Sequence, residues 1–305
     1  MKPTLLLAIP LGKAFEQKFA ERYTLTSDMN ERKEAEALIT IGALPADGGF
    51  MDSMPKLKLI SCFGSGYESI DLEAAAKRGI KVTNTVGANS ATVADHAVAL
   101  LLASVRHVVS SDKLIRAGKW RGDDIGKVLF SPGMTGRRIG ILGLGTIGWK
   151  IAERLAAFET EVAYFSRTKK PDAPWRYFDS LLALAEWADV LMIAHRADES
   201  NRHLINAEVL KAIGPEGHIV NISRGSAVDE DALIAALKNG TIAGAGLDVF
   251  DDEPNVRPEF IELPNVVLTP HIGGGTREAF AAMSNAVLAN VDAFFDGRPL
   301  PNPVV

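Results

Sequence analysis

The sequence predicts an α/β fold of two lobes, each built around a parallel β-sheet. Short apolar runs alternate with helical patterns along almost the whole chain, which is typical of strands joined by crossover helices. Polar and apolar residues do not alternate within these runs, as expected for strands that are buried on both faces. A length of 305 residues suits two domains of ordinary size.

The expected strands are short apolar runs bounded by polar or glycine-containing segments. They are Thr4–Ile9, Leu38–Ile41, Leu57–Cys62, Arg138–Leu142, Glu161–Phe165, Val190–Ala194, His218–Ile222, Ala243–Asp248 and Val266–Leu268. The helical patterns between them cover residues 13–22, 71–78, 147–158, 179–187, 206–213 and 229–239.

Two further helical patterns are longer than a crossover requires, and they set the expected domain organisation. Ser90–Gly118 begins with a serine suited to an N-cap and ends with a glycine suited to a C-cap, and Thr276–Asp296 is the second. We interpret both as connections between domains. A central domain of residues 91–275 would then be inserted into a smaller domain made of residues 1–90 and 276–305.

The composition is that of a globular protein, with 47% hydrophobic and 23% charged residues. The net charge of −5 favours neither nucleic acid nor an anionic membrane as a partner. Because Cys62 is the single cysteine, no intramolecular disulfide can form, and we expect a buried thiol in a reducing, cytoplasmic setting. The N-terminal apolar run is interpreted as a strand and not as a signal peptide, and no stretch has the length of a membrane span.

A glycine-rich turn in the middle of the chain predicts a dinucleotide site. Gly143, Gly145 and Gly148 follow an expected strand and open an expected helix, which is the context that makes this spacing meaningful. The first glycine permits a tight turn, the second lets a pyrophosphate approach the backbone, and the third lets the helix pack on the strand. The phosphates would face the helix N-terminus. A turn without a ligand is the alternative, and these flanks disfavour it. The expected contacts are Gly143, Leu144, Gly145, Thr146, Ile147 and Gly148.

The segment after the next strand predicts NADPH in preference to NADH. A site selective for NAD usually has a carboxylate there for the ribose 2′-hydroxyl, whereas this chain has Ser166–Lys170 and no acid. Arg167 can form a bidentate contact with a 2′-phosphate, the hydroxyls of Ser166 and Thr168 can donate to its oxygens, and Lys169 adds charge. A solvated basic loop without a ligand is the alternative.

Charged residues that follow three successive strands are the candidates for chemistry. Arg224 follows one strand, Asp248 and Glu253 follow the next, and His271 follows the third, before three glycines. Ligands of α/β sheets bind at the carboxyl ends of strands, so these residues form a candidate site. A structural ion network is the alternative. No spacing typical of metal ligands is found.

The other histidines carry weaker expectations. His96 and His107 lie in the long helical pattern and are expected to be packing or surface groups. His203 and His218 lie near the ends of expected elements, with no charged partner in the local sequence. His195 follows a strand of the central domain and is a candidate for the edge of the cofactor site.

Several motifs resemble those of the D-isomer-specific 2-hydroxyacid dehydrogenases, along nearly the whole chain. They are GSGYESID, NSATVADHAVALLL, GLGTIG, NISRGSAVDEDALIAAL, GAGLDVFDDEP and LTPHIGGGT. The resemblance implies two Rossmann-like lobes, with an NAD(P)-binding Rossmann domain at residues 91–275 and a substrate domain formed by the remainder. The SRT segment resembles the NADPH-dependent glyoxylate/hydroxypyruvate reductases of that family.

The resemblance also implies a role for each candidate residue. His271 would protonate the substrate carbonyl, Glu253 would bind the other ring nitrogen and favour the charged imidazolium, and Arg224 would bind the substrate carboxylate. Asp248 would orient the nicotinamide carboxamide. Backbone N–H groups of one loop, Phe63–Gly66, would bind the carboxylate; its residues are Phe63, Gly64, Ser65 and Gly66, with Ser65 and Gly66 closest. Arg224 and His271 are expected to contact the cofactor as well as the substrate. The remaining residues expected to line the cofactor are Thr92, Ile222, Ser223, Gly273 and Gly274.

Two departures from the family pattern bear on specificity. His195 and Arg196 stand where many relatives have apolar residues and proline, and Arg196 is a candidate for the adenosine phosphates. Reductases of this type can insert a tryptophan from the partner subunit into the substrate pocket. Here Trp120 precedes the corresponding loop, and Val128, Leu129 or Phe130 would take that place.

The expected activity is NADPH-dependent reduction of glyoxylate or hydroxypyruvate to the D-2-hydroxy acid. A broader reductase acting on pyruvate or phenylpyruvate is the alternative within the same class. A dinucleotide-sensing corepressor is the alternative in another class. The helix at Ser90–Gly118 and the loop after it resemble the dimer-forming arm of the family, so a homodimer is expected.

Overall fold

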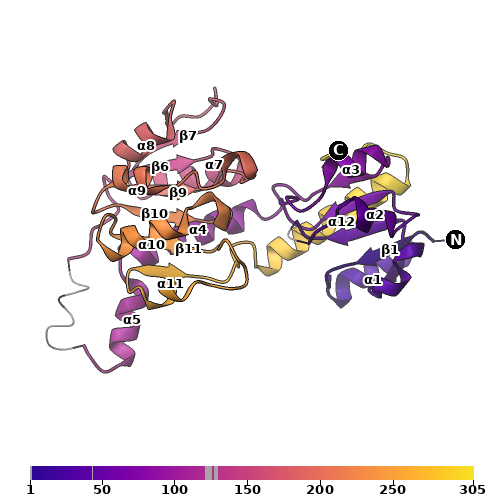
Figure 1. Cartoon of the computed structure of the whole chain (residues 1–305), viewed down its shortest axis with the longest axis horizontal. Helices are drawn as coiled ribbons and strands as arrows, with labels where there is room; N and C mark the ends of the chain where they lie inside the picture. Colours follow the sequence, from indigo (N-terminus) through magenta and orange to yellow (C-terminus); the bar gives the residue numbers. More distant parts are fainter. Residues whose placement is uncertain (1, 43, 121–125, 127–129) are drawn as a thin grey trace. The chain divides into compact units, whose positions relative to one another are not determined.

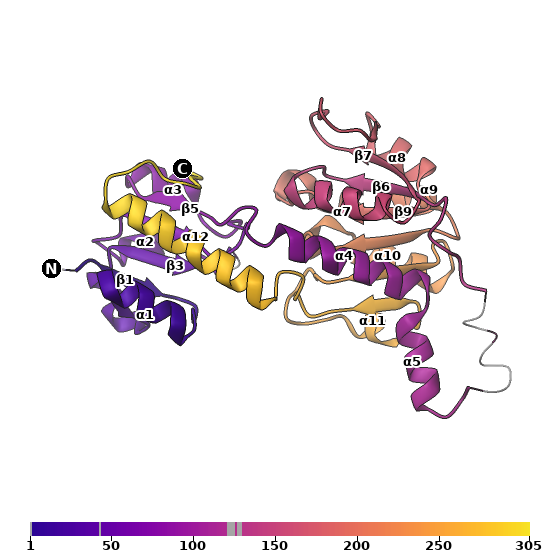
Figure 2. The same cartoon turned by 180° about the vertical axis from the view of Figure 1, so that it is seen from behind.

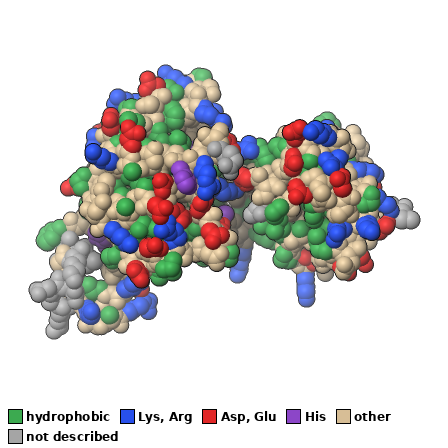
Figure 3. All heavy atoms as spheres, in the orientation of Figure 1, with side chains coloured by type: hydrophobic (Ala, Val, Ile, Leu, Met, Phe, Trp, Pro, Cys, Tyr) green, Lys and Arg blue, Asp and Glu red, His purple; other side chains and the backbone are tan. Residues whose placement is uncertain are grey.

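The computed structural model describes residues 2–42, 44–120, 126 and 130–305, and it confirms an α/β fold with two parallel sheets. The chain forms two compact units (Figure 1). One unit comprises Met1–Asn89 and Gly275–Val305, and the other comprises Ser90–Gly274. Side chains of both signs of charge are interspersed over the face drawn in Figure 3.

The first unit contains a five-stranded parallel sheet in the order β2-β1-β3-β4-β5. Its strands are β1 (Thr4–Leu7), β2 (Thr24–Thr26), β3 (Ala37–Thr40), β4 (Leu59–Cys62) and β5 (Lys81–Thr83). Its helices are α1 (Lys13–Arg22), η1 (Met29–Glu34), α2 (Gly48–Asp52), α3 (Leu72–Lys77) and α12 (Arg277–Phe295). Phe19 of α1 and Val287 of α12 pack on one side of the sheet, whereas Met51 of α2 and Ala75 of α3 belong to a second cluster.

The second unit contains a seven-stranded parallel sheet in the order β12-β11-β10-β9-β6-β7-β8. Its strands are β6 (Arg138–Leu142), β7 (Glu161–Phe165), β8 (Arg176–Tyr177), β9 (Val190–Ile193), β10 (His218–Asn221), β11 (Gly244–Leu247) and β12 (Val266–Leu268). β7 and β8 lie on one side of β6, and β9 to β12 lie on the other, so the strand order reverses between β6 and β9. Such a point is where open α/β sheets bind ligands.

Helices cover both faces of this larger sheet, as Figures 1 and 2 show from opposite sides. On one face, α4 (Ser90–Val105) packs against α7 (Thr146–Ala156), and both contribute to one apolar core. The other core takes in further helices: α8 (Leu181–Trp187), α9 (Ala207–Ile213), α10 (Glu230–Lys238) and α11 (Pro258–Glu262). The short helices η2 (Glu199–Asn201) and η3 (Gly225–Ala227) lie in loops.

The prediction of a single helix over Ser90–Gly118 is wrong, because the helix is interrupted at His107. The backbone of His107 is left-handed, with φ 51°, and its N–H donates to the carbonyl of Ser104. A separate helix, α5 (Val108–Arg116), follows at a bend of 61°. No single helix in the described part of the chain is long and apolar enough to cross a membrane. The two helices α4 and α5 together reach the length and apolar composition of a membrane span, but they are bent relative to each other.

Candidate active site

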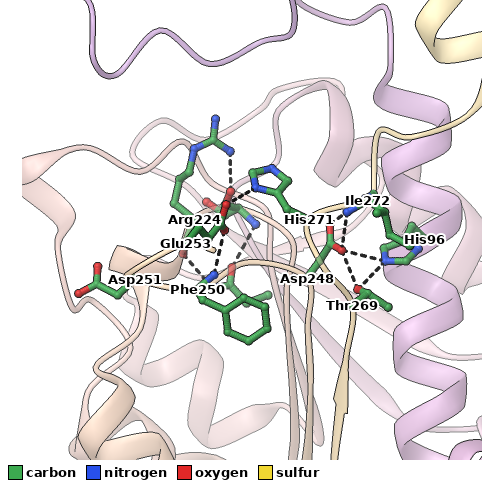
Figure 4. A network of polar contacts seen from close by, with 12 residues as sticks. His96, Arg224, Asp248, Phe250, Asp251, Glu253, Thr269, His271 and Ile272 are labelled. Atoms are coloured by element: carbon green, nitrogen blue, oxygen red, sulfur yellow. Dashed lines mark hydrogen bonds and ion pairs between the residues drawn. The ribbon is translucent and has the colours of Figure 1, made fainter. Parts of the chain in front are cut away.

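Three neighbouring strands bring the predicted charged residues to one edge of the larger sheet. β10, β11 and β12 are parallel and adjacent, with Asn221 paired to Leu247 and Leu247 paired to Leu268. Because the carboxyl ends of parallel neighbours lie at the same edge, the segments after these strands meet there. Figure 4 shows the side chains of Arg224, Glu253 and His271 grouped together at this place.

His271 and Glu253 are in direct contact. Nδ1 of His271 lies 2.6 Å from Oε2 of Glu253, and Oε1 of the same carboxylate accepts the N–H of Phe250 at 3.0 Å. Burial by itself raises the pKa of Glu253. The hydrogen bonds from His271 and Phe250 and the charges of His271 and Arg224 outweigh that effect, so the pKa lies below its ordinary value. The carboxylate is therefore ionised at neutral pH and places a negative charge beside the imidazole of His271.

Arg224 supplies the cation of the group. It lies just after β10, and its Nη1 donates to the carbonyl of Ser223 at 2.7 Å. The Nδ2 of Asn221 donates to the carbonyl of Arg224 at 2.8 Å, which holds the backbone at this point. The sheet edge thus combines a guanidinium, which can bind a carboxylate, with an imidazole that can deliver a proton.

Gly225 joins the Arg224 loop to the Glu253 loop, a role that the sequence did not reveal. A Cβ atom on Gly225 would lie 1.9 Å from the carbonyl carbon of Phe250 and 2.1 Å from the nitrogen of Asp251. Only a glycine therefore permits the two backbones to approach this closely. The N–H of Asp251 in turn donates to Glu230 at 3.0 Å, so the Glu253 loop is held from two directions.

Asp248 anchors the loop that carries His271. Its side chain is only 3% exposed, and its carboxylate accepts the N–H of Ile272 at 2.9 Å, the N–H of Gly273 at 2.8 Å and the hydroxyl of Thr269 at 2.6 Å. Its backbone carbonyl accepts the N–H of His271 at 2.8 Å. These bonds hold His271 at φ 52°, a left-handed conformation that is uncommon outside glycine.

The glycine turn has the shape that a dinucleotide needs. A Cβ on Gly143 would lie 2.4 Å from the Cα of His195, and one on Gly148 would lie 2.0 Å from the carbonyl oxygen of Gly143. At Gly145, in contrast, a Cβ would meet nothing within 4 Å, and no side chain caps α7 there. The helix N-terminus is therefore open to an anion, and these residues fit a pyrophosphate. Leu144 is buried, while Thr146 and Ile147 begin the helix.

The segment after β7 presents a basic group and no carboxylate. The hydroxyl of Ser166 donates to the carbonyl of Thr168 at 2.8 Å, which turns the chain around Arg167. The pKa of Asp198 is lowered, first by hydrogen bonds from Ser200 and also by the charges of Arg167 and Arg196. Both arginines therefore lie near the same carboxylate, at the ends of β7 and β9.

His195 lies between the glycine turn and the segment after β10. Its carbonyl accepts the hydroxyl of Ser223, and its backbone touches Gly143. Neither ring nitrogen has a hydrogen bond of good geometry to the described residues. Burial lowers the pKa of His195, and the charge of Arg167 acts in the same direction. The ring is therefore neutral at physiological pH.

The loop Phe63–Gly66, which was predicted to bind the substrate, lies in the first unit after β4. The N–H of Phe63 donates to Thr40, and the N–H of Gly64 donates to the hydroxyl of Thr85. The N–H groups of Phe63 and Gly64 are therefore engaged within the unit. Ser65 and Gly66, which were expected to lie closest to the carboxylate, remain the candidates.

Other predicted residues are placed as follows. Thr92 lies in the first turn of α4, and Ile222 and Ser223 are buried directly after β10. Gly274 is the last residue of the larger unit. Phe130 is 98% exposed, whereas Val128 and Leu129 lie outside the described residues. Among the described residues, no group of three potential ligands could hold a metal ion.

His96 departs from its expected role as a packing or surface group. Its Nε2 lies 2.9 Å from the hydroxyl of Thr269 and 3.2 Å from Oδ1 of Asp248 (Figure 4). It thus joins the loop of His271 from α4, a helix far earlier in the chain. No local pattern around His96 could have revealed this, because both partners belong to distant segments.

Comparison with known proteins places the chain in a family. The sequence model described as "D-isomer specific 2-hydroxyacid dehydrogenase, NAD binding domain" matches residues 98–273. The chain is 38% identical to a hydroxyphenylpyruvate reductase of Plectranthus scutellarioides over 311 residues, which covers 99% of this chain and 98% of that protein. It is 37% identical to a glyoxylate/hydroxypyruvate reductase of Arabidopsis thaliana, again over 99% of this chain and 98% of that protein.

A solved structure agrees with this placement. The NADPH-dependent glyoxylate/hydroxypyruvate reductase of Sinorhizobium meliloti, in complex with NADP and malonate, is similar with a TM-score of 0.90 and 35% identity. The alignment covers 100% of this chain and 97% of that one. The fold and the site define an NAD(P)-dependent oxidoreductase. The chain belongs to the D-isomer specific 2-hydroxyacid dehydrogenase family.

Proposed function

We propose that the protein reduces a small 2-keto acid, glyoxylate or hydroxypyruvate, to the D-2-hydroxy acid with NADPH. The observation that carries this proposal is the grouping of Arg224, Glu253 and His271 at the carboxyl edge of the larger sheet, with 2.6 Å between His271 and Glu253. This reduction needs a proton donor, a carboxylate that holds that donor in place, and a cation that binds the carboxylate of the substrate.

When bound, the nicotinamide would supply the hydride for the keto carbon. His271 would donate a proton to the carbonyl oxygen as that oxygen gains charge, and Glu253 would hold the ring through Nδ1. Arg224 binds the substrate carboxylate and polarises the keto group. The N–H groups of Ser65 and Gly66 are proposed as further carboxylate donors, on the strength of the family resemblance.

We propose that Ser90–Gly274 is the dinucleotide-binding domain. The open N-terminus of α7 at Gly145 supports pyrophosphate binding. Thr92, Ile222, Gly273 and Gly274 are proposed to line the nicotinamide side. Asp248 is proposed to orient the carboxamide, in addition to its contacts with the His271 loop. His195 is proposed to lie at the edge of the adenosine site.

We further propose that the protein prefers NADPH over NADH. Ser166–Lys170 contains no carboxylate for a ribose 2′-hydroxyl, and Arg167 with Arg196 supplies positive charge beside Asp198. A 2′-phosphate would engage these guanidiniums and the hydroxyls of Ser166 and Thr168. The reductase of Sinorhizobium meliloti that was solved with NADP is consistent with this preference.

We also propose that the protein is a homodimer through α5. No residue of α5 is buried within the chain, and Val108, Val109 and Ile115 are exposed on it. An apolar helix face of this kind is typical of a protein–protein contact. Sedimentation equilibrium should give twice the mass of the chain, and a monomer at micromolar concentration would contradict the proposal.

Initial rates with NADPH and NADH against glyoxylate, hydroxypyruvate, pyruvate and phenylpyruvate test the proposed activity. The proposal expects the highest kcat/KM with NADPH and glyoxylate or hydroxypyruvate. Higher values for phenylpyruvate would favour the second candidate, a broader 2-keto-acid reductase, which the similarity to a hydroxyphenylpyruvate reductase supports. Absence of turnover with every keto acid would overturn the proposal and favour a binding role, such as that of a corepressor.

A further inference from the structure

His96 lies outside the group of charged residues at the sheet edge, yet it contacts the loop that positions His271. Its ring lies on α4 and is 19% exposed. The Nε2 atom is within 2.9 Å of the Thr269 hydroxyl and 3.2 Å of Asp248 Oδ1, while the Thr269 hydroxyl is itself 2.6 Å from that oxygen. These three side chains form a closed triangle of polar contacts.

The chemistry of the triangle determines the direction of each hydrogen bond. An ionised carboxylate only accepts, so the single proton of the Thr269 hydroxyl goes to Asp248 along the shorter contact. The hydroxyl oxygen can then only accept from His96. Nε2 of His96 must therefore carry a hydrogen, which it shares between Thr269 and Asp248. His96 therefore donates to Thr269, which precedes His271, and to Asp248, which binds the backbone of the His271 loop.

The same carboxylate holds the backbone next to His271. Asp248 accepts the N–H groups of Ile272 and Gly273, and a Cβ on Gly273 would lie 2.8 Å from its Oδ2 and 3.5 Å from the Cδ2 of His96. The loop is thus packed closely between Asp248 and His96. Because His271 has a left-handed backbone, φ 52°, the surrounding contacts must hold it there.

The triangle also joins the first and the last segments of the larger unit. The chain enters the larger unit at Ser90, the first residue of α4, and leaves it at Gly274, the last residue of the His271 loop. His96 belongs to the first segment, and Thr269 and Gly273 belong to the second. Of the donors named for the Asp248 carboxylate, His96 is the one supplied by α4.

We infer that His96 is a positioning residue for the proposed proton donor: its Nε2–H fixes Thr269 and Asp248, and through them the backbone that aims the His271 ring. This inference rests on the proposed function for the role of His271, but the hydrogen-bond arrangement that it invokes does not. Its loss should lower the rate of the chemical step more than it weakens dinucleotide binding, because the residues proposed to bind the pyrophosphate and the 2′-phosphate lie outside the triangle, and only Asp248 and Gly273 are shared with the nicotinamide side.

The test uses two substitutions of His96, one that removes the N–H donor and one that keeps such a donor. His96→Leu removes the donor at nearly constant volume, and His96→Gln places an amide N–H near the position of Nε2. We expect kcat with the best keto acid to fall about 10- to 100-fold in His96→Leu and to recover to within about 3-fold of wild type in His96→Gln. The dissociation constant for NADPH, measured by fluorescence titration, should rise several-fold less than kcat falls in His96→Leu, and it should stay within about 2-fold of wild type in His96→Gln.

Asp95→Ala is the matched control on the same helix. Asp95 forms an exposed ion pair with Arg154, and its removal perturbs α4 without touching the triangle. It should leave kcat near the wild-type value. A kcat within about 2-fold of wild type in His96→Leu, or a loss that His96→Gln does not restore, would overturn the inference. A fall in NADPH affinity equal to the fall in kcat would also overturn it.

Amide hydrogen exchange separates this inference from the proposed function. The N–H groups of Ile272 and Gly273 should exchange at least about 10-fold faster in His96→Leu than in the wild type, and near the wild-type rate in His96→Gln. This readout needs no substrate. Unchanged exchange in His96→Leu would overturn the positioning role even in an active enzyme. Faster exchange in a protein that reduces no keto acid would support the hydrogen-bond arrangement and refute only the proposed activity.

Discussion

Nδ1 of His271 lies 2.6 Å from Oε2 of Glu253, although the two residues follow different strands of the sheet. The pairing follows from topology, because β11 and β12 are parallel neighbours whose carboxyl ends meet. The other oxygen of Glu253 is bonded to the Phe250 N–H, so the carboxylate has a fixed orientation toward the ring. The paired ring is therefore held in a defined orientation at the sheet edge.

Substitution of Glu253 by Gln should lower kcat. A neutral amide can still contact Nδ1, but it lacks the negative charge that Glu253 places beside the ring. We expect a loss of about 10- to 100-fold in kcat with hydroxypyruvate. Steady-state rates measure it. A kcat within about 2-fold of wild type would contradict the role assigned to the carboxylate.

Substitution of Gly225 by Ala should damage the site through the backbone. The new Cβ would lie 1.9 Å from the carbonyl carbon of Phe250, so the Arg224 loop and the Glu253 loop must separate. We expect destabilisation of about 1–3 kcal/mol and a fall in kcat of about 100-fold. Urea unfolding and steady-state kinetics measure these effects. Gly133→Ala is the control, since a Cβ there meets nothing within 4 Å, and equal behaviour of the two variants would refute the assignment.

Substitution of Arg167 by Ala should change the choice of dinucleotide. A charge-assisted contact with a 2′-phosphate contributes about 1.5–3 kcal/mol, so KM for NADPH should rise about 10- to 100-fold while KM for NADH changes little. Arg176→Ala removes a nearby arginine that stands over the ring of Phe178, and it should leave the ratio of the two KM values unchanged. If Arg167→Ala weakens both dinucleotides equally, the proposed 2′-phosphate contact is wrong.

His218 should make stability depend on pH between about 6.5 and 4. Burial, with help from the charges of Arg137 and His107, lowers the pKa of His218 to about 4 from its ordinary value of 6.5. The unfolded chain therefore binds more protons in this range. The stabilisation is fully present above pH 6.5 and is lost as the pH falls toward 4, by about 3 kcal/mol in total.

His218→Phe removes this titration, so its free energy of unfolding should fall less between pH 7.5 and 4.5 than that of the wild type. Urea unfolding at several pH values measures the difference. His203→Phe, at an exposed histidine of the same unit, should retain the wild-type pH dependence. Identical slopes for the wild type and His218→Phe would show that His218 is protonated while the protein is folded.

Most of the larger sheet could be predicted because its strands are apolar runs bounded by clear turn residues. The strands β2, β5 and β8 were missed, since Thr24–Thr26, Lys81–Thr83 and Arg176–Tyr177 are short and partly polar. The break at His107 was missed because the residues on both sides favour a helix. Only the left-handed backbone of His107 reveals it.

The residues of the candidate site, too, could be predicted only in part. Arg224, Glu253 and His271 could be predicted because each follows a recognisable strand, and parallel strands bring such residues together. The contacts of His96 and Gly225 could not, because they join segments distant in the chain and depend on the packing of α4 and of two loops. Asp248 was predicted as a functional residue, but its bonds to the His271 loop were visible only in three dimensions.

The most direct test of the central claim is the rate of NADPH oxidation in His271→Ala with saturating hydroxypyruvate, measured together with the dissociation constant for NADPH. We predict that this rate falls about 10²- to 10⁴-fold and that the affinity for NADPH falls far less. A rate within a few-fold of the wild-type value would contradict the role of His271, because the proton would then have to come from another group.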